Sequence, residues 1–346
     1  MIRSIREKLD FSDVLLQPRV APHLALASRS EVNIQVNGAV PIIVANMDSI
    51  GNFKVARLLS PYRMQVAILK DFTLDQWKEA IEHPYKEEGD LEAIQLDPRL
   101  LIPTLGLRDV EYEVKRVRSI IEAFPTINMV CLDVANGYLQ TVADGVKRIK
   151  DALGSSVKVC AGNVVEAEGL IHLARAGADV VKVGIGSGGV CLTRKMTGVG
   201  CPQFSAVADI AHVAKELGVE LVSDGGMVDP GDAVKAFVAG ADYIMAGSYF
   251  AGHEETGNTF HGMSSDRSRT VRGEAVADYR TSEGREVVLA KKGSLGHTIR
   301  ELLGGIRSAC TYLGVANLEE LKTTEIEVAR VYRQLNRIQG VAEENR

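Results

Sequence analysis

The apolar residues of the chain follow two alternating patterns, and the alternation predicts a repeated strand–helix unit. Short runs rich in Val, Ile and Leu are apolar at nearly every position, as in strands buried on both faces of a parallel sheet. Each run precedes a window with apolar residues at helical spacing. The predicted strands are Pro41–Ala45, Gln65–Leu69, Leu101–Leu105, Met129–Asp133, Val157–Ala161, Val180–Gly184, Glu220–Ser223 and Tyr243–Gly247. The predicted helices lie near 52–59, 73–81, 109–124, 138–153, 166–176, 205–217, 230–239 and 295–313.

Eight consecutive strand–helix units predict the α/β class and a (β/α)8 TIM barrel. An open, doubly wound sheet is the alternative, but nothing divides the chain into two halves. Two similar junctions, RAGADVVKVG at 175–184 and VAGADYIMAG at 238–247, support equivalent units. We therefore interpret residues 1–346 as a single catalytic barrel domain.

Two connections and the tail depart from this repeat. Residues 86–99 are acidic and polar and indicate a surface excursion, whereas 249–294 is too long for an ordinary loop and is expected to be functional. From about residue 318, apolar residues recur at helical spacing. This pattern predicts a helical extension that packs on the barrel or on a partner subunit, with Ile326, Val328, Val331, Leu335 and Ile338 on its apolar face.

Composition excludes several classes of protein. The chain is 46% hydrophobic and 25% charged, as in ordinary soluble globular proteins, and its net charge of −5 argues against a nucleic-acid surface. No apolar run approaches the roughly 18 residues of a membrane span, and the charged N-terminus does not resemble a signal peptide. Five cysteines without regular spacing indicate reduced thiols in a cytoplasmic enzyme. Neither CxxC nor HExxH occurs, so no zinc site is expected.

In a TIM barrel the active site lies at the carboxyl ends of the strands. Polar residues and glycines gather there in the predicted structure, which packing alone does not require. The set consists of Asn46, Asp48, Lys70, Asp133, Asn136, Tyr138, Asn163, Cys191, Thr193, Asp224, Gly225, Gly226, Gly247 and Ser248.

The glycine-rich segment after the sixth strand, GIGSGGVC at 184–191, points to a nucleophile. Cys191 lies in a permissive loop beside a hydroxyl and a cation, whereas Cys131 and Cys160 lie inside strands and are interpreted as buried apolar residues. The positions of Cys201 and Cys310 are left open. The loop is neither a P-loop nor a dinucleotide fingerprint. Its carbonyls either coordinate a monovalent cation or belong to a flexible turn.

Two further strand ends are suited to a nucleotide. In SDGG at 223–226, Asp224 suits a ribose diol, while the glycines admit a phosphate to backbone N–H groups. A tight turn with a capping aspartate is the alternative. AGS at 246–248 ends the last strand, where barrels commonly bind phosphate.

These residues belong to longer motifs through which the chain resembles the IMP dehydrogenase/GMP reductase family over almost its whole length. The motifs are LDFSDVLLQP, PIIVANMDSI, CLDVANGY, AGNVV, VKVGIGSGGVCLTR, TGVGCPQ, SDGG, GMSS, YRTSEG and LGGIRSACTYLG. DVANGY, AGNVV, GMSS with YRTSEG, and RSACTYLG resemble the reductase branch. The segment 86–99 is too short for the regulatory CBS pair that most dehydrogenases insert.

The resemblance implies NADPH-dependent reductive deamination of GMP to IMP and ammonia, a step of purine metabolism. Cys191 would attack C2 of GMP and form a covalent thioimidate, which the hydride of NADPH would then resolve. Thr193 and Glu283 match the pair that moves the proton needed by the departing ammonia. On its own, Glu283 in TSEGRE would be interpreted as a solvated loop charge.

The resemblance also assigns binding roles and a homotetramer, without a nucleic-acid or membrane partner. The positions matching substrate sites are Asp224, Gly225, Gly226, Gly247, Ser248, Gly262, Met263, Ser264, Arg280, Ser282 and Gly284. The positions matching NADPH sites are Ser28, Arg29, Lys70, Asp133, Val134, Ala135, Tyr279, Ser308 and Thr311, of which the first two and last two would reach across from a neighbouring subunit. The carbonyls of Gly186, Gly188 and Cys191 match potassium ligands.

The phosphate loop departs from the family pattern GPGSVCTTR. Ser187 replaces Pro, Gly189 replaces the phosphate-binding Ser, and Leu192 replaces Thr. His261 stands where a Tyr usually contacts the phosphate, and Ser248 stands where reductases usually have Gly. Ser248 and His261 are therefore expected to replace the lost phosphate hydroxyls.

Two alternatives remain from the sequence. An IMP dehydrogenase that lacks the CBS domain would run the opposite hydride transfer, but no dehydrogenase-type Arg-Tyr flap is found. A purine-nucleotide-binding protein that has lost catalysis would explain the altered loop, but not the retention of Cys191, Thr193 and Glu283.

Overall fold

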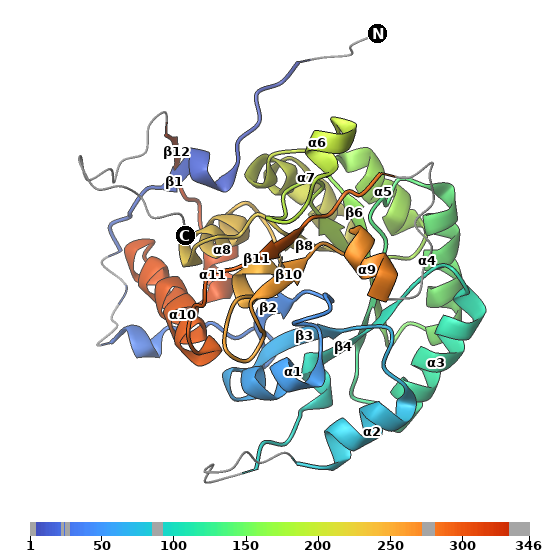
Figure 1. Ribbon diagram of the computed structural model, residues 1–346. Helices are drawn as coiled ribbons and strands as arrows, with labels where there is room; N and C mark the ends of the chain where they lie inside the picture. The colour runs from blue at the N-terminus through green and yellow to red at the C-terminus, as the bar shows by residue number, and fades with distance from the viewer. Residues whose placement is uncertain (1–4, 22–23, 25–27, 85–92, 272–280, 332–346) are drawn as a thin grey trace.

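The computed structural model contains a closed barrel of eight parallel strands, which confirms the predicted (β/α)8 fold (Figure 1). It describes residues 5–21, 24, 28–84, 93–271 and 281–331. The strands pair in chain order, and the last pairs with the first to close the barrel. The barrel strands are β2 (Val40–Val44), β3 (Met64–Ile68), β4 (Leu101–Leu105), β5 (Met129–Leu132), β6 (Lys158–Val164), β7 (Val180–Val183), β8 (Glu220–Asp224) and β9 (Tyr243–Ala246).

Eight helices follow the eight strands and surround the barrel, each close to its predicted position (Figure 1). The helix after β7 is preceded by a short extra turn, α6 (Thr193–Thr197). The surrounding helices are α1 (Phe53–Leu59), α2 (Leu74–Glu82), α3 (Val110–Ala123), α4 (Gln140–Leu153), α5 (Ala167–Arg175), α7 (Gln203–Leu217), α8 (Pro230–Val238) and α10 (Leu295–Tyr312). None of the described helices is long and apolar enough to cross a bilayer.

Local sequence explains where strands and helices begin. β2, β3, β4 and β5 are buried at every position, in keeping with strands that have the barrel interior on one face and helices on the other. Several helices begin at a side chain that satisfies a free backbone N–H. Asn52 accepts from Val55, Asp109 accepts from Tyr112, and Pro230 supplies the preset first turn of α8.

The elements outside the barrel are short and were mostly absent from the sequence interpretation. The long segment after β9 contains a two-stranded ribbon, β10 (Thr259–His261) with β11 (Glu286–Val288), and the helix α9 (Asp266–Val271). In Figure 1 this ribbon lies across the barrel strands. A second ribbon pairs β1 (Val14–Leu16) with β12 (Val328–Arg330).

The tail corrects one prediction. A helix does begin at residue 318, but α11 covers only Leu318–Thr323. Val328 lies in β12, so the predicted helix through Ile326, Val328 and Val331 is wrong. Over so short a stretch, apolar residues at every second position are compatible with a strand as well as with a helix. β12 forms as a strand because it pairs with the edge of β1. The predicted apolar positions Leu335 and Ile338 lie outside the described residues.

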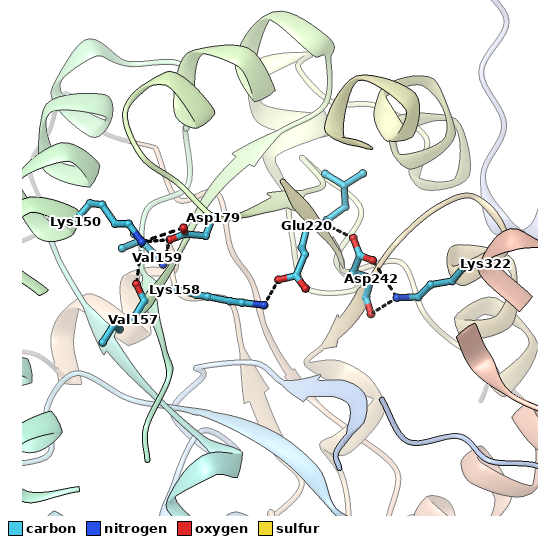
Figure 2. A network of polar contacts seen from close by, with 9 residues as sticks. Lys150, Val157, Lys158, Val159, Asp179, Glu220, Asp242 and Lys322 are labelled. Atoms are coloured by element: carbon cyan, nitrogen blue, oxygen red, sulfur yellow. Dashed lines mark hydrogen bonds and ion pairs between the residues drawn. The ribbon is translucent and has the colours of Figure 1, made fainter. Parts of the chain in front are cut away.

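The two similar junctions are structurally equivalent (Figure 2). The carboxylate of Asp179 accepts the backbone N–H of Val159 at 2.8 Å, and that of Asp242 accepts the N–H of Leu221 at 2.9 Å. Each carboxylate also receives a lysine ammonium. Lys150 Nζ lies 2.7 Å from Asp179, and Lys322 Nζ lies 3.0 Å from Asp242. Each aspartate thereby fixes the start of its own strand to the preceding strand.

A third ion pair lies between these two junctions. Lys158 Nζ at the start of β6 contacts Glu220 Oε2 at the start of β8, at 2.5 Å (Figure 2). All three pairs lie at the amino ends of the strands, the face that stabilises a TIM barrel.

We expect Asp179→Ala and Asp242→Ala each to lower the free energy of unfolding by about 2 kcal/mol, because each leaves a backbone N–H and an ammonium without their acceptor. Urea unfolding followed by circular dichroism measures the change. Asp151→Ala is the matched control: it breaks an exposed pair with Lys147, and about 0.5 kcal/mol or less is expected. Equal effects at all three positions would contradict the assigned role.

Candidate active site

A cavity of about 1000 Å³ opens at the carboxyl ends of the strands. This is the face where TIM-barrel chemistry takes place. The predicted site residues that line it are Asp133, Val134, Ala135, Gly186, Gly188, Cys191, Thr193, Asp224, Gly225, Gly226, Gly247, Ser248, Gly262, Met263, Ser264, Glu283 and Gly284.

Glu283 reaches the cavity because its segment pairs with the glycine-rich loop. Leu192 donates its N–H to the carbonyl of Glu283 at 2.7 Å, and Arg285 donates to the carbonyl of Val190 at 3.0 Å. Between these bonds, Cys191 lies opposite Gly284 as in an antiparallel sheet. The interpretation of Glu283 as a solvated loop charge is therefore wrong.

Three side chains then form a continuous hydrogen-bonded line. Thr193 Oγ1 donates to Glu283 Oε2 at 2.7 Å, and the thiol of Cys191 donates to Thr193 Oγ1 at 3.3 Å. A hydroxyl carries one proton, so a threonine that donates to a carboxylate can only accept from the thiol. The arrangement gives the thiol proton a path toward Glu283, as an activated nucleophile requires.

The end of β8 anchors the loop that carries Cys191. Gly184 has a φ of +147°, and a Cβ there would lie 2.2 Å from the carbonyl oxygen of Asp224, so only glycine fits. Ser187, which replaces the Pro of the family pattern, donates its hydroxyl to the same carbonyl at 3.0 Å. The serine that replaces proline at position 187 thus adds a hydrogen bond between the loop and β8.

Two of the carboxylates that line the cavity, Asp224 and Asp133, have different neighbours. Asp224 Oδ2 accepts from the amide of Asn163 at 2.8 Å, and Asn163 also donates to the carbonyl of Gly184. Asp133 Oδ2 lies 3.4 Å from Lys70 Nζ, so these two residues, both predicted for the cofactor, lie next to each other. Asp224 is therefore held by a neutral amide and Asp133 by a cation.

Two residues at the predicted phosphate site differ from the family pattern in complementary ways. A Cβ built on Gly189 would lie 3.4 Å from Ser248 Oγ, so the hydroxyl of Ser248 faces the space that a side chain at 189 would enter. His261 contacts Asp48 Oδ2 through Nε2 at 2.7 Å and is not among the residues lining the cavity. The geometry thus favours Ser248 rather than His261 as the replacement hydrogen-bond donor.

Some predicted residues are not brought to this cavity. Ser282 shapes the turn beside Glu283, donating to the carbonyl of Gly284 at 2.7 Å. Four predicted cofactor residues lie outside the barrel, where the 3-10 turn Arg29–Glu31 contacts α10. Ser28 precedes this turn and Arg29 begins it, whereas Ser308 and Thr311 lie on α10. Arg29 lines a separate hollow there with Arg307. Tyr279 and Arg280 lie outside the described residues.

The sequence interpretation overlooked one cavity residue with unusual chemistry. Lys182 lies in the middle of β7, lines the cavity and is only 4% exposed. The available signal was a lysine within the apolar run VVKVG, where a buried strand normally has none. In the described part of the chain, no group of three His, Cys, Asp or Glu side chains is arranged to hold a metal ion.

Comparisons with a family model and with individual proteins identify the same family. The family model for the IMP dehydrogenase / GMP reductase domain matches residues 8–337. GMP reductase 2 of Mus musculus and that of Homo sapiens are each 42% identical to the chain over 355 aligned positions, covering 96% of both partners. GMP reductase of Yersinia pestis (strain Pestoides F) is 40% identical over 356 positions, which cover 96% of this chain and 97% of the relative.

We expect iodoacetamide at mildly alkaline pH to modify one thiol per folded chain rapidly, and that thiol to be Cys191. Cys191 is partly exposed, whereas the other four cysteines are buried. Burial also raises the pKa of the Cys201 thiol, and that of Cys310 to about 11, which disfavours the reactive thiolate. Mass spectrometry after partial labelling identifies the site.

The matched controls are Cys191→Ala, which should lose the rapid phase, and Cys310→Ala, which should keep it. A rapid phase that persists in Cys191→Ala would contradict the assignment.

Proposed function

Because the chain belongs to the IMP dehydrogenase/GMP reductase family, we propose that it is a GMP reductase that converts GMP and NADPH to IMP, NADP⁺ and ammonia. The observation that carries the proposal is the hydrogen-bonded line Cys191–Thr193–Glu283 at the cavity wall. The relatives named GMP reductase cover nearly the whole chain, which supports the reductase over the dehydrogenase.

In the first half of the reaction, the sulfur of Cys191 bonds to C2 of GMP. The C2–N bond breaks, and the thiol proton leaves with the nitrogen as ammonia, so that a thioimidate remains on Cys191. Thr193 relays this proton because its hydroxyl contacts both the thiol and the carboxylate. Glu283 supports Thr193, whose hydroxyl alone is a poor acid.

In the second half, a hydride replaces sulfur at C2, which is the chemistry that NADPH supplies when bound. The C2–S bond breaks, and Cys191 leaves with the bonding pair as a thiolate. The thiolate then takes up one proton from solvent beside Thr193, in place of the proton that left with ammonia. The product is IMP.

The nucleotide is held along the ends of β8 and β9. Asp224, fixed by Asn163, accepts both ribose hydroxyls, and Gly226 and Gly247 offer their backbone N–H groups to the phosphate. Gly225 lines the same part of the cavity, but its N–H donates to the carbonyl of Met245 at 3.0 Å. Ser248 supplies a hydroxyl donor there. Met263 and Ser264 lie where the base is expected, as does Gly284 beside Cys191.

The cofactor site combines the cavity with a second copy of the chain. Lys70, Asp133, Val134 and Ala135 form the nicotinamide side. Ser28, Arg29, Ser308 and Thr311 lie together on another surface, so they complete the site of a neighbouring subunit in a homotetramer. The two groups of cofactor residues lie on separate surfaces of one chain, which supports a cofactor site shared between two subunits.

A potassium ion is proposed at the turn of the loop. The turn is closed by the N–H of Cys191, which donates to the carbonyl of Gly188 at 3.0 Å, and Gly186 has a φ of +78°. The carbonyl oxygens of Gly186, Gly188 and Cys191 each have two lone pairs, so one remains for a cation even where a hydrogen bond is made. The ion would hold the Cys191 loop in place.

We expect the protein to oxidise NADPH when GMP is present and not to reduce NAD⁺ when IMP is present. Absorbance at the reduced-cofactor band follows both reactions. Cys191→Ala should lower kcat by at least about 10³-fold because the covalent step is lost, and Glu283→Gln by about 10²-fold or more because the relay loses its carboxylate.

Glu286→Gln is the matched control for Glu283→Gln, since Glu286 is exposed on β11 three positions away. It should retain kcat within about twofold. Turnover in Cys191→Ala equal to the parent would refute the mechanism, and NAD⁺ reduction with IMP alone would indicate the dehydrogenase instead.

We further expect Ser248→Gly to raise KM for GMP about fivefold, since one neutral hydrogen bond to the phosphate is worth on the order of 1 kcal/mol. The exchange variant Gly189→Ser/Ser248→Gly should recover most of the loss, because a side chain at 189 enters the same space. An unchanged KM in Ser248→Gly would show that Ser248 does not bind the phosphate.

A further inference from the structure

The ribbon of β10 and β11 adjoins the segment that brings Glu283 to Thr193, and it is too short to hold its own position. Each strand has three residues, and an isolated two-stranded ribbon is marginally stable in water. The ribbon nevertheless lies across the barrel strands (Figure 1). Its position must therefore be fixed by side chains that contact the barrel.

Two neighbouring side chains of β10 make such contacts. Phe260 is only 2% exposed and lines the cavity, and a Cβ built on Gly247 would lie 3.3 Å from its Cζ, so the ring packs against the end of β9. The next residue, His261, does not line the cavity, and its Nε2 lies 2.7 Å from Asp48 Oδ2. Successive side chains point to opposite faces of a strand, so Phe260 and His261 hold the ribbon by its two faces.

Asp48 is a firm anchor because it lies in a tight turn after β2. The N–H groups of Ile50 and Gly51 both donate to the carbonyl of Met47, at 2.9 and 2.7 Å. The side chains of His261 and Asp48 are only 13% and 20% exposed, so little water reaches their contact. A carboxylate can only accept, so Nε2 of His261 donates, and such charge-assisted hydrogen bonds are stronger than neutral ones.

The path from His261 to Glu283 contains no flexible side chain. Gly262, which follows His261, donates its N–H to the carbonyl of Arg285 at 3.1 Å. A Cβ on Gly262 would lie 2.9 Å from the Cα of Gly284, the residue next to Glu283. Backbone segments packed this closely cannot move independently, so a displacement of His261 reaches Glu283.

We propose that His261 and Asp48 are positioning residues that hold Glu283 at hydrogen-bonding distance from Thr193. This inference rests on the proposed function, in which Glu283 supports proton transfer while ammonia leaves. Neither His261 nor Asp48 lines the cavity, so both act through the backbone that carries the carboxylate. The histidine that stands in place of the family's tyrosine thus serves the chemical step rather than the phosphate.

The first experiment compares His261→Phe and His261→Gln with the parent protein in the assay with GMP and NADPH. Phenylalanine keeps the ring and removes the donor, whereas the amide nitrogen of glutamine can still donate to Asp48. His261→Phe should lower kcat about tenfold and raise KM for GMP less than about threefold, because a misplaced catalytic group costs rate more than binding. His261→Gln should keep kcat within about threefold of the parent, because the hydrogen bond is retained.

A double-mutant cycle tests whether His261 acts through Glu283. In the Glu283→Gln background, adding His261→Phe should lower kcat less than about twofold, since the effects of residues that act as one unit are not additive. His261→Leu provides a second variant without the donor should His261→Phe fold poorly.

Amide hydrogen exchange measures the same displacement without any substrate. The N–H groups of Leu192 and Arg285 are protected by the pairing that carries Glu283. In His261→Phe, peptides covering residues 190–192 and 283–286 should exchange about tenfold faster than in the parent, because the pairing opens more often. In His261→Gln they should exchange at nearly the parent rate.

His253→Leu is the matched control. His253 belongs to the same long segment after β9, and its Nε2 lies 2.8 Å from Thr298 Oγ1, but this contact is made with α10 rather than beside the glycine-rich loop. His253→Leu should lower the unfolding midpoint by at least as much as His261→Phe, because a buried polar contact is lost. Its kcat should stay within about twofold of the parent, and exchange near Glu283 should not change.

A kcat in His261→Phe equal to that of the parent would overturn the proposal. So would equal losses in the Phe and Gln variants, an equal loss with and without Glu283, or unchanged exchange in residues 190–192 and 283–286. Failure of the parent protein to reduce GMP is a separate outcome that refutes the proposed function. The exchange measurements would then still decide whether His261 positions Glu283.

Discussion

The candidate site depends on the backbone pairing between residues 190–192 and 283–285. Two hydrogen bonds, Leu192 to Glu283 at 2.7 Å and Arg285 to Val190 at 3.0 Å, bring together segments about ninety positions apart. The pairing leaves no room for a side chain at Gly284, where a Cβ would lie 3.0 Å from Gly262 and from the Ser265 nitrogen. Without this approach, Thr193 has no carboxylate and the thiol of Cys191 has no proton acceptor beyond a hydroxyl.

A second constraint fixes the same loop relative to the end of β8, where the nucleotide is proposed to bind. Gly184 permits contact with the Asp224 carbonyl, and Ser187 and Asn163 bridge the loop and the end of β8. Cys191, the proposed nucleophile, and Asp224, proposed to bind the ribose, are therefore held by one hydrogen-bonded network. Such positioning accounts for a large share of what an enzyme contributes to a reaction between bound groups.

The barrel was predictable from sequence because its strands and helices are encoded locally. Apolar runs and capping residues such as Asn52 and Asp109 mark them directly, and the equivalence of Asp179 and Asp242 follows from a repeated motif. β12 was not predictable. Over a stretch of about five residues, the same apolar positions fit the repeat of a helix and the repeat of a strand, and the partner strand β1 lies more than 300 positions away. The proposed role of Glu283 came only from family resemblance, because its local sequence is that of a solvated loop.

Lysines at the amino ends of the strands are paired differently from the lysine inside the barrel. This difference explains why the sequence pattern did not identify Lys182 as a cavity residue. At the amino ends, Lys150, Lys158 and Lys322 each contact a carboxylate within 3.0 Å, so their charges are satisfied by the fold. Inside the barrel, the ammonium of the buried Lys182 makes no ion pair within 4.0 Å with any residue that the structure describes. In the sequence, the only sign of such a residue is a charged side chain within an otherwise apolar strand.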